Sequence, residues 1–293
     1  MKLHDEVQTG NSDCRTLKKS LFGREESEMA DPEHVMGLNY EEKLNDLVEA
    51  SNSAEANIAA RSLLGNSQRF SKPHFRALND LYNLAYRYKL DDPWLLNLFQ
   101  SRWIRQINMK DVTDAPLTKF HTALKDYLIG LDFQPDGFDG VKGSQRLRIR
   151  SDAMDGENSV IAQLERAVRH VGKKYIEFLK KSNYPKEYIT DNLDITKYVM
   201  ATKSGGYHFP HLHNNVVFVV AYYVYVPENN DGKIVFGLNR RPGVPKLHAP
   251  DFAERQPSTG DFIVFPGFFS HRTTPSSGSE MRINIAFDFK PTS

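Results

Sequence analysis

Cysteine is almost absent from this chain: Cys14 is the only one in 293 residues. A single cysteine excludes an internal disulfide, a thiolate metal cage and Cys-x-x-Cys redox chemistry. This composition fits a reducing environment inside the cell, and we therefore expect a cytoplasmic protein.

Long apolar runs and a dominant charge are also missing. The longest apolar run is the segment 216–226, far shorter than the roughly 20 residues that cross a bilayer. The first six residues contain no apolar core of a secretory signal. With 38 basic and 37 acidic residues the net charge is +1, which provides no general attraction for nucleic acid. We expect a soluble protein with neither membrane nor nucleic acid as partner, and the oligomeric state stays open.

Several common catalytic motifs are missing as well. The sequence contains no phosphate-binding loop, no Rossmann fingerprint, no Gly-x-Ser-x-Gly elbow and no His-Glu-x-x-His zinc motif. Nucleotide-dependent, serine hydrolase and zinc protease activities therefore have little support.

What is present suggests three regions. Residues 1–54 mix charged and small polar residues without a long period, so we expect a flexible or loosely packed N-terminal arm. Residues 55–183 have the spacing of a helical region, and residues 184–293 have the texture of a β core. We expect the last two regions to pack as one unit. Helices are expected at 75–85, 94–107, 117–131 and 159–179.

The β region consists of short apolar or alternating segments joined by Gly, Pro and Asn turns. Strands are expected at 195–202, 216–226, 233–236, 262–266 and 282–289. Because no helix interrupts them, they favour an antiparallel sandwich or barrel. The predicted fold class is mainly β with α: a C-terminal double-stranded β-helix, or jelly roll, preceded by a helical region.

The segment His211-Leu212-His213 stands directly before the longest apolar run. Residues i and i+2 of a strand point to the same face, and His271 can arrive from another strand. Such a set can hold one divalent metal, since imidazole suits iron, zinc, copper and nickel. Against this, His-x-His pairs also occur on ordinary surface loops, and His208 shows that this loop is simply rich in histidine.

The order of the surrounding residues resembles the 2-oxoglutarate- and Fe(II)-dependent oxygenase superfamily. There, a His-x-Asp/Glu motif precedes a core strand, and a distal histidine and then an arginine follow a Gly-Asp and Phe-Pro passage. The matching segments lie within about residues 195–290. They are 206–213, 221–227 and 260–266, followed by Ser270-His271 and 282–287.

The resemblance implies a set of roles and cofactors. His211 and His271 would be iron ligands, and Arg282 would bind the distal carboxylate of 2-oxoglutarate, because a buried guanidinium gives a carboxylate a bidentate partner. Asn284 and either Tyr222 or Tyr223 would add hydrogen bonds. Fe(II), 2-oxoglutarate as co-substrate and dioxygen are the implied cofactors.

The chain departs from the family at His213, where a carboxylate is expected. His213 can be the third ligand, the iron can have two protein ligands only, or Asn214, His208 or a distant carboxylate can complete the set. We favour His213. Replacing a carboxylate by imidazole makes the site one charge more positive and strengthens its attraction for anions.

The family chemistry implies hydrogen abstraction from a small-molecule substrate, leading to hydroxylation, desaturation or oxidative cyclisation. The cations near the expected site suit an acidic amino-acid derivative, although they can equally be solvated loop charges. The candidate substrate-binding residues are Lys203, Tyr207, Arg240, Arg241 and Arg272.

Two other classes of function compete with this one. A three-histidine cupin-like metalloenzyme would not use 2-oxoglutarate and would not need Arg282. A non-catalytic jelly roll that binds a ligand or partner would tolerate alanine at His211 and His271.

Overall fold

The computed structural model describes residues 43, 44, 46, 52–113, 116–131, 134–135, 146–149, 159–237, 251–277 and 280–292. All of them belong to one compact unit, residues 40–293. Within these described ranges, no helix combines the length and the apolar character that a membrane crossing requires.

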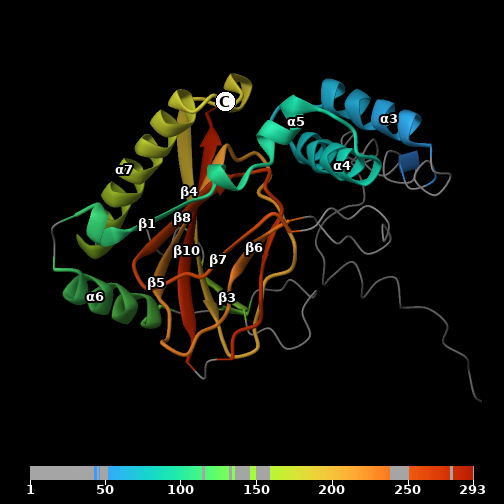
Figure 1. Ribbon diagram of the computed structural model, residues 1–293. Coiled ribbons are helices and arrows are strands. Elements are labelled where there is room, and N and C mark those ends of the chain that lie inside the picture. Colours follow the sequence, from blue (N-terminus) through green and yellow to red (C-terminus); the bar gives the residue numbers. More distant parts are fainter. Residues whose placement is uncertain are drawn as a thin grey trace, which may run out of the picture. The chain divides into compact units, whose positions relative to one another are not determined.

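A large antiparallel sheet forms the centre of this unit (Figure 1). Its strand order is β1-β8-β5-β10-β4-β3-β2. β10 lies between β4 and β5, with Arg282 opposite Thr202 and Asn284 opposite Tyr223. The strands are β1 (Arg105–Asn108), β2 (Gln134–Pro135), β3 (Arg146–Ile149), β4 (Leu193–Thr202), β5 (Phe218–Tyr225), β8 (Asp261–Pro266) and β10 (Arg282–Pro291).

A second sheet, of order β7-β6-β9, packs against the first. Its strands are β6 (Ile234–Phe236), β7 (Ala253–Arg255) and β9 (His271–Thr273). Phe236 of β6 meets Phe265 of β8 edge to face, with ring centroids 4.9 Å apart. Because apolar side chains from both sheets fill the space between them, this is a β sandwich. The predicted class, a jelly roll combined with helices, is confirmed.

Two helices cover the outer face of the large sheet, α6 (Leu117–Ile129) and α7 (Ser159–Lys181). Tyr175 of α7 packs on Phe218 of β5 at 5.2 Å between ring centroids. A Cβ at Gly172 would come within 2.7 Å of the Phe289 ring, so only glycine lets α7 approach β10 this closely. Both helices are confirmed: α7 was predicted from its apolar stripe, and α6 from the start signal that precedes Leu117 in the sequence.

Three helices precede the sheets: α3 (Ser53–Asn66), α4 (Lys72–Tyr88) and α5 (Pro93–Leu98). α3 packs against α4, while α4 and the end of α5 contact the loop between β8 and β9. Phe75 of α4 lies 5.8 Å from Phe268 between ring centroids, and Phe99 stacks on Phe269 at 5.8 Å. The side-chain amide of Asn79 donates to the carbonyl of Phe268 at 2.9 Å. These contacts support the loop that leads directly into His271.

The helix predicted for 94–107 is wrong in its second half. α5 ends at Leu98, a 3₁₀ turn follows at Ser101–Trp103, and Arg105–Asn108 becomes β1. Strand pairing with β8, in which Ile107 lies opposite Phe262, overrides the local helical pattern.

Most of the predicted N-terminal arm lies outside the described residues. Of its few described residues, Leu44 is helical and only 3% exposed. The short strands β2 and β3 also lie in the region that was predicted to be helical.

Candidate metal centre

His211 and His271 are held together by their backbones. They form an antiparallel bridge in which the N–H of His211 donates to the carbonyl of His271 at 3.0 Å, and the reverse bond measures 2.9 Å. A pair that exchanges both backbone hydrogen bonds brings its side chains to neighbouring positions. The ring centroids of the two histidines are 4.3 Å apart.

His213 is held by the other end of the loop between β8 and β9. Its N–H donates to the carbonyl of Gly267 at 3.0 Å. A Cβ at Gly267 would meet the carbonyl oxygen of Val216 at 2.2 Å, so this close approach requires glycine. The ring of His213 lies 5.2 Å from that of His271 and 5.3 Å from that of His211.

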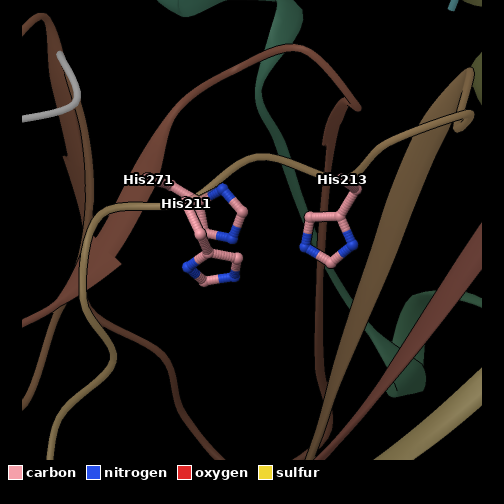
Figure 2. Close-up of side chains that lie close together, drawn as sticks. All are labelled: His211, His213 and His271. Atoms are coloured by element: carbon pink, nitrogen blue, oxygen red, sulfur yellow. The ribbon is translucent and has the colours of Figure 1, made fainter. Parts of the chain in front are cut away.

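The three imidazoles converge on one region, as Figure 2 shows, with His213 facing the other two. One ring nitrogen from each of His211, His213 and His271 lies within 4.8 Å of the others. The predicted residues are therefore brought together, from two segments far apart in the sequence. The segment 212–215 is not a regular strand, so local loop geometry, and not only strand alternation, aims His213.

Hydrogen bonds fix which nitrogen of each ring is available. Nδ1 of His211 donates to the carbonyl of Phe209 at 2.7 Å, and Nδ1 of His271 donates to the carbonyl of Phe269 at 3.0 Å. Nδ1 of His213 donates to Oδ1 of Asp288 at 2.7 Å. Because each Nδ1 carries the proton, each Nε2 keeps its lone pair for a metal.

Burial keeps His271 in the neutral form that a metal needs. The desolvation of its ring lowers its pKa well below the usual value, and the nearby His211 and His213 lower that pKa further. Neutral imidazole is the metal-binding form, so His271 requires no deprotonation at neutral pH.

The described residues offer no carboxylate to the histidine cluster itself. Asp288 contacts Nδ1 of His213 on the outer side of that ring. The ring of His208 lies 6.2 Å from that of His211 and belongs to no metal-sized group in the described part of the chain, and Asn214 is exposed. Among the alternatives for the third ligand, the geometry supports His213.

Arg282 is almost completely buried, at 1% exposure, at the start of β10. Its Nη1 donates to the carbonyl of Gly232 at 3.0 Å, and its Nε has no hydrogen-bond partner. Among the described residues, no carboxylate lies within ion-pair distance of this guanidinium. Desolvation lowers the pKa of Arg282. A buried cation in this state is costly unless an anion joins it, so the residue fits a carboxylate ligand.

Asn284 and Tyr223 accompany Arg282, and Tyr222 does not. Asn284 shares the inner face of β10 with Arg282 and lies opposite Tyr223, whose ring centroid is 6.0 Å from the guanidinium carbon. Tyr222 points to the outer face, where its hydroxyl pairs with Nε2 of His121 at 2.7 Å. Because neighbouring strand residues face opposite ways, the geometry favours Tyr223 over the predicted Tyr222 as a companion of Arg282.

The candidate substrate residues have different surroundings. Arg272 forms two hydrogen bonds with Asp251, at 2.6 and 2.5 Å, so its charge is already paired and the prediction for it loses its support. Lys203 is exposed, and the half-buried Tyr207 packs edge to face on Phe209 at 5.3 Å. Arg240 and Arg241 lie outside the described residues.

Comparison with known families adds a further observation. Residues 197–288 match the family described as "Putative 2OG-Fe(II) oxygenase". This part of the chain is similar to that family. The match begins in β4, ends at Asp288 and includes all three clustered histidines together with Arg282. The description of that family names Fe(II) and 2-oxoglutarate, and three neutral nitrogen donors in the sandwich that also buries Arg282 suit a ferrous ion and a dicarboxylate.

No curated protein sequence matches this chain, but several solved structures resemble it in part. A prolyl-4-hydroxylase of Pseudomonas putida is 12% identical, with 65% of this chain and 93% of that chain covered and a TM-score of 0.45. HygX of Streptomyces hygroscopicus, solved with nickel and 2-oxoglutarate, is 14% identical, with 64% and 83% covered and a TM-score of 0.46. The collagen prolyl hydroxylase of Paramecium Bursaria Chlorella virus-1 is 17% identical, with 66% and 98% covered and a TM-score of 0.42.

Proposed function

We propose that the protein is a 2-oxoglutarate-dependent oxygenase that holds Fe(II) through His211, His213 and His271, binds 2-oxoglutarate through Arg282, and oxidises a C–H bond of a small molecule. One observation carries the assignment: three imidazoles converge in the same sandwich that buries an arginine without a carboxylate partner among the described residues. The first feature meets the needs of a divalent metal, and the second meets those of a carboxylate.

The protein groups bind and orient the reactants. The Nδ1 atoms of the three histidines are each bonded to an acceptor, which leaves their Nε2 atoms to bind the ion. Arg282 is fixed by Gly232 and presents a guanidinium that can pair with the distal carboxylate of 2-oxoglutarate. When bound, Fe(II) with dioxygen and 2-oxoglutarate supplies the oxidation, in which hydroxylation converts C–H to C–OH while 2-oxoglutarate becomes succinate and CO₂.

Buried aromatic side chains form an apolar wall on one side of the proposed metal site. The ring of Phe265 lies 4.6 Å from that of His271, and the ring of Phe236 lies 5.9 Å from it. Both phenylalanines are buried. An apolar wall excludes water from a reactive centre and strengthens the electrostatic interactions beside it.

For the substrate we propose a small molecule such as an acidic amino-acid derivative. Its support is the exposed Lys203 on the segment after β4, together with the sequence positions of Arg240 and Arg241. Arg272 adds no support, because Asp251 neutralises it. Whether the product is hydroxylated, desaturated or cyclised depends on where the substrate presents its C–H bond.

Calorimetric titration of the Ni(II)-loaded protein with 2-oxoglutarate tests this function. We expect wild type to bind both ligands, and Arg282→Gln to keep Ni(II) affinity but lose about 10- to 100-fold in 2-oxoglutarate affinity, the effect of removing a charged hydrogen-bonded partner. Arg272→Gln is the matched control, because it removes an arginine that is already paired. It should leave both affinities unchanged.

The three-histidine set also favours a second candidate, the cupin-like metalloenzyme. That enzyme would bind Ni(II), ignore 2-oxoglutarate and tolerate Arg282→Gln. Failure of wild type to bind any metal would reject both candidates.

A further inference from the structure

Asp288 is a buried carboxylate on β10 that the roles given above do not use. It is 5% exposed, and its Oδ1 accepts the hydrogen bond from Nδ1 of His213 at 2.7 Å. Within the described part of the chain, His213 is its ion-pair partner. Burying a carboxylate costs free energy unless a hydrogen-bond donor or a cation accompanies it, and the His213 imidazole provides such a donor.

Strand alternation explains how Asp288 reaches the metal site. Along β10, Asn284 lies two positions after Arg282, and Asp288 lies four positions after Asn284. Even separations place all three side chains on the same face of the strand, the inner one. On the outer face, Phe289 stacks on Phe218. One strand thus carries both the cation proposed for 2-oxoglutarate and an anion behind one of the proposed metal ligands.

The charge of the site makes this anion significant. Three neutral imidazoles would leave both positive charges of a divalent ion uncompensated in a partly buried site. A carboxylate hydrogen-bonded to the far side of a ligating imidazole makes that imidazole a stronger donor and fixes its orientation and tautomer. Asp288 is placed to do both for His213.

We propose that Asp288 is a positioning residue that acts through His213, so that the two residues together replace a carboxylate bound directly to the metal. This inference rests on the metal site proposed above. It adds that the negative charge of the site lies one imidazole away from the ion, and that His213 loses much of its value as a ligand without Asp288.

Competition with a chelating dye, with Co(II) as the metal, measures the effect. We expect Asp288→Asn to weaken Co(II) binding about 10- to 100-fold, the usual cost of removing such a partner, and to alter the visible ligand-field spectrum of the bound ion. Asp261→Asn is the matched control, because Asp261 is also buried on the large sheet but bonds Gln106 and Asn108. It should leave the affinity and the spectrum unchanged.

A double-mutant cycle separates this role from a general effect on the fold. In a His213→Ala background, Asp288→Asn should cause no further loss of Co(II) affinity, because the imidazole through which Asp288 acts is absent. Equal losses in both backgrounds would overturn the inference. So would unchanged affinity in Asp288→Asn while wild type binds Co(II), whereas failure of wild type to bind Co(II) rejects the metal site itself.

A measurement on wild type alone covers the case in which the variants do not fold. In a long-range ¹H–¹⁵N spectrum of the Zn(II)-loaded protein, His213 should carry its proton on Nδ1 and bind the metal through Nε2. A proton on Nε2 of His213 would overturn the inference.

Discussion

At the residue scale, Arg282 depends on the space that Gly232 leaves for it. The guanidinium donates to the Gly232 carbonyl at 3.0 Å, and a Cβ at Gly232 would come within 2.9 Å of Nη1 and 3.1 Å of the Asn230 amide oxygen. Because the φ of Gly232 is not positive, the requirement is for space and not for an unusual backbone. An added methyl group must therefore move the arginine.

Gly232→Ala should weaken 2-oxoglutarate binding roughly tenfold, since a displaced guanidinium loses part of a charge-assisted contact. Ni(II) affinity should not change, because the histidines do not contact this turn. Calorimetry with both ligands measures the two affinities. Gly65→Ala, where a Cβ meets nothing within 4 Å, is the control and should leave both unchanged. Equal 2-oxoglutarate affinity in Gly232→Ala and wild type would show that Arg282 is not the anchor.

The sequence alone could identify some of these residues and not others. His211, His271 and Arg282 stood out because their types and order are characteristic of a family. The sequence could not decide between Tyr222 and Tyr223, since β5 is apolar on both faces and its pattern does not show which tyrosine points inward. Asp288 was missed although a signal existed: it shares the alternation of Arg282 and Asn284 within a buried strand.

At the scale of elements, the loop between β8 and β9 holds the site and the N-terminal helices hold that loop. The amide of Asn79 on α4 bonds the carbonyls of Phe75 and Phe268 at 2.7 and 2.9 Å. Phe269, one residue further on, provides the carbonyl that orients His271. A helix distant in sequence therefore contributes to the geometry of the metal centre.

Asn79→Ala should lower the free energy of unfolding by about 1–3 kcal/mol, because buried carbonyls lose their donor. It should also weaken Ni(II) binding modestly, since the loop before His271 becomes less constrained. Urea unfolding and calorimetry measure the two effects. Asn66→Ala removes only an exposed hydrogen bond from the Asn66 side-chain amide to Ser62, so it should change neither the free energy of unfolding nor the Ni(II) affinity. If Asn79→Ala is destabilised but binds Ni(II) as tightly as wild type, helix α4 does not contribute to the geometry of the metal site.

The elements differ in how far local sequence determines them. Helices α4 and α7 followed from apolar stripes, and α6 followed from the start signal before Leu117. The start of α5 followed from Asp92, whose side chain accepts from Leu95 N at 3.1 Å. Strand β1 could not be predicted this way. Its first two residues are exposed and polar, and it exists because β8, about 150 residues later, supplies its hydrogen bonds.

At the scale of the whole molecule, metal binding should stabilise the fold. The proposed ligands join the segment before β5 to the first residue of β9, so the bound ion would connect the two sheets through their loops. A ligand that binds only the folded state contributes about 2.7 kcal/mol when present at 100 times its Kd.

We therefore expect Ni(II) at that excess to raise the melting temperature by roughly 5–10 °C for a chain of this size. His271→Ala should abolish the increase. His74→Ala is the matched control, because it removes another buried histidine, one bonded to Tyr188 away from the cluster, and it should lower the melting temperature while keeping the increase. Differential scanning calorimetry measures these melting temperatures. If Ni(II) still raises the melting temperature of His271→Ala, the ion binds elsewhere.

The most direct test of the central claim is an anaerobic titration of the Fe(II)-loaded protein with 2-oxoglutarate, followed by visible absorption. A metal held by His211, His213 and His271 and a co-substrate anchored by Arg282 predict the weak charge-transfer band of an iron chelate in wild type and its loss in Arg282→Ala. Iron binding without a band in wild type, or a band of equal strength in Arg282→Ala, would contradict this assignment of the site.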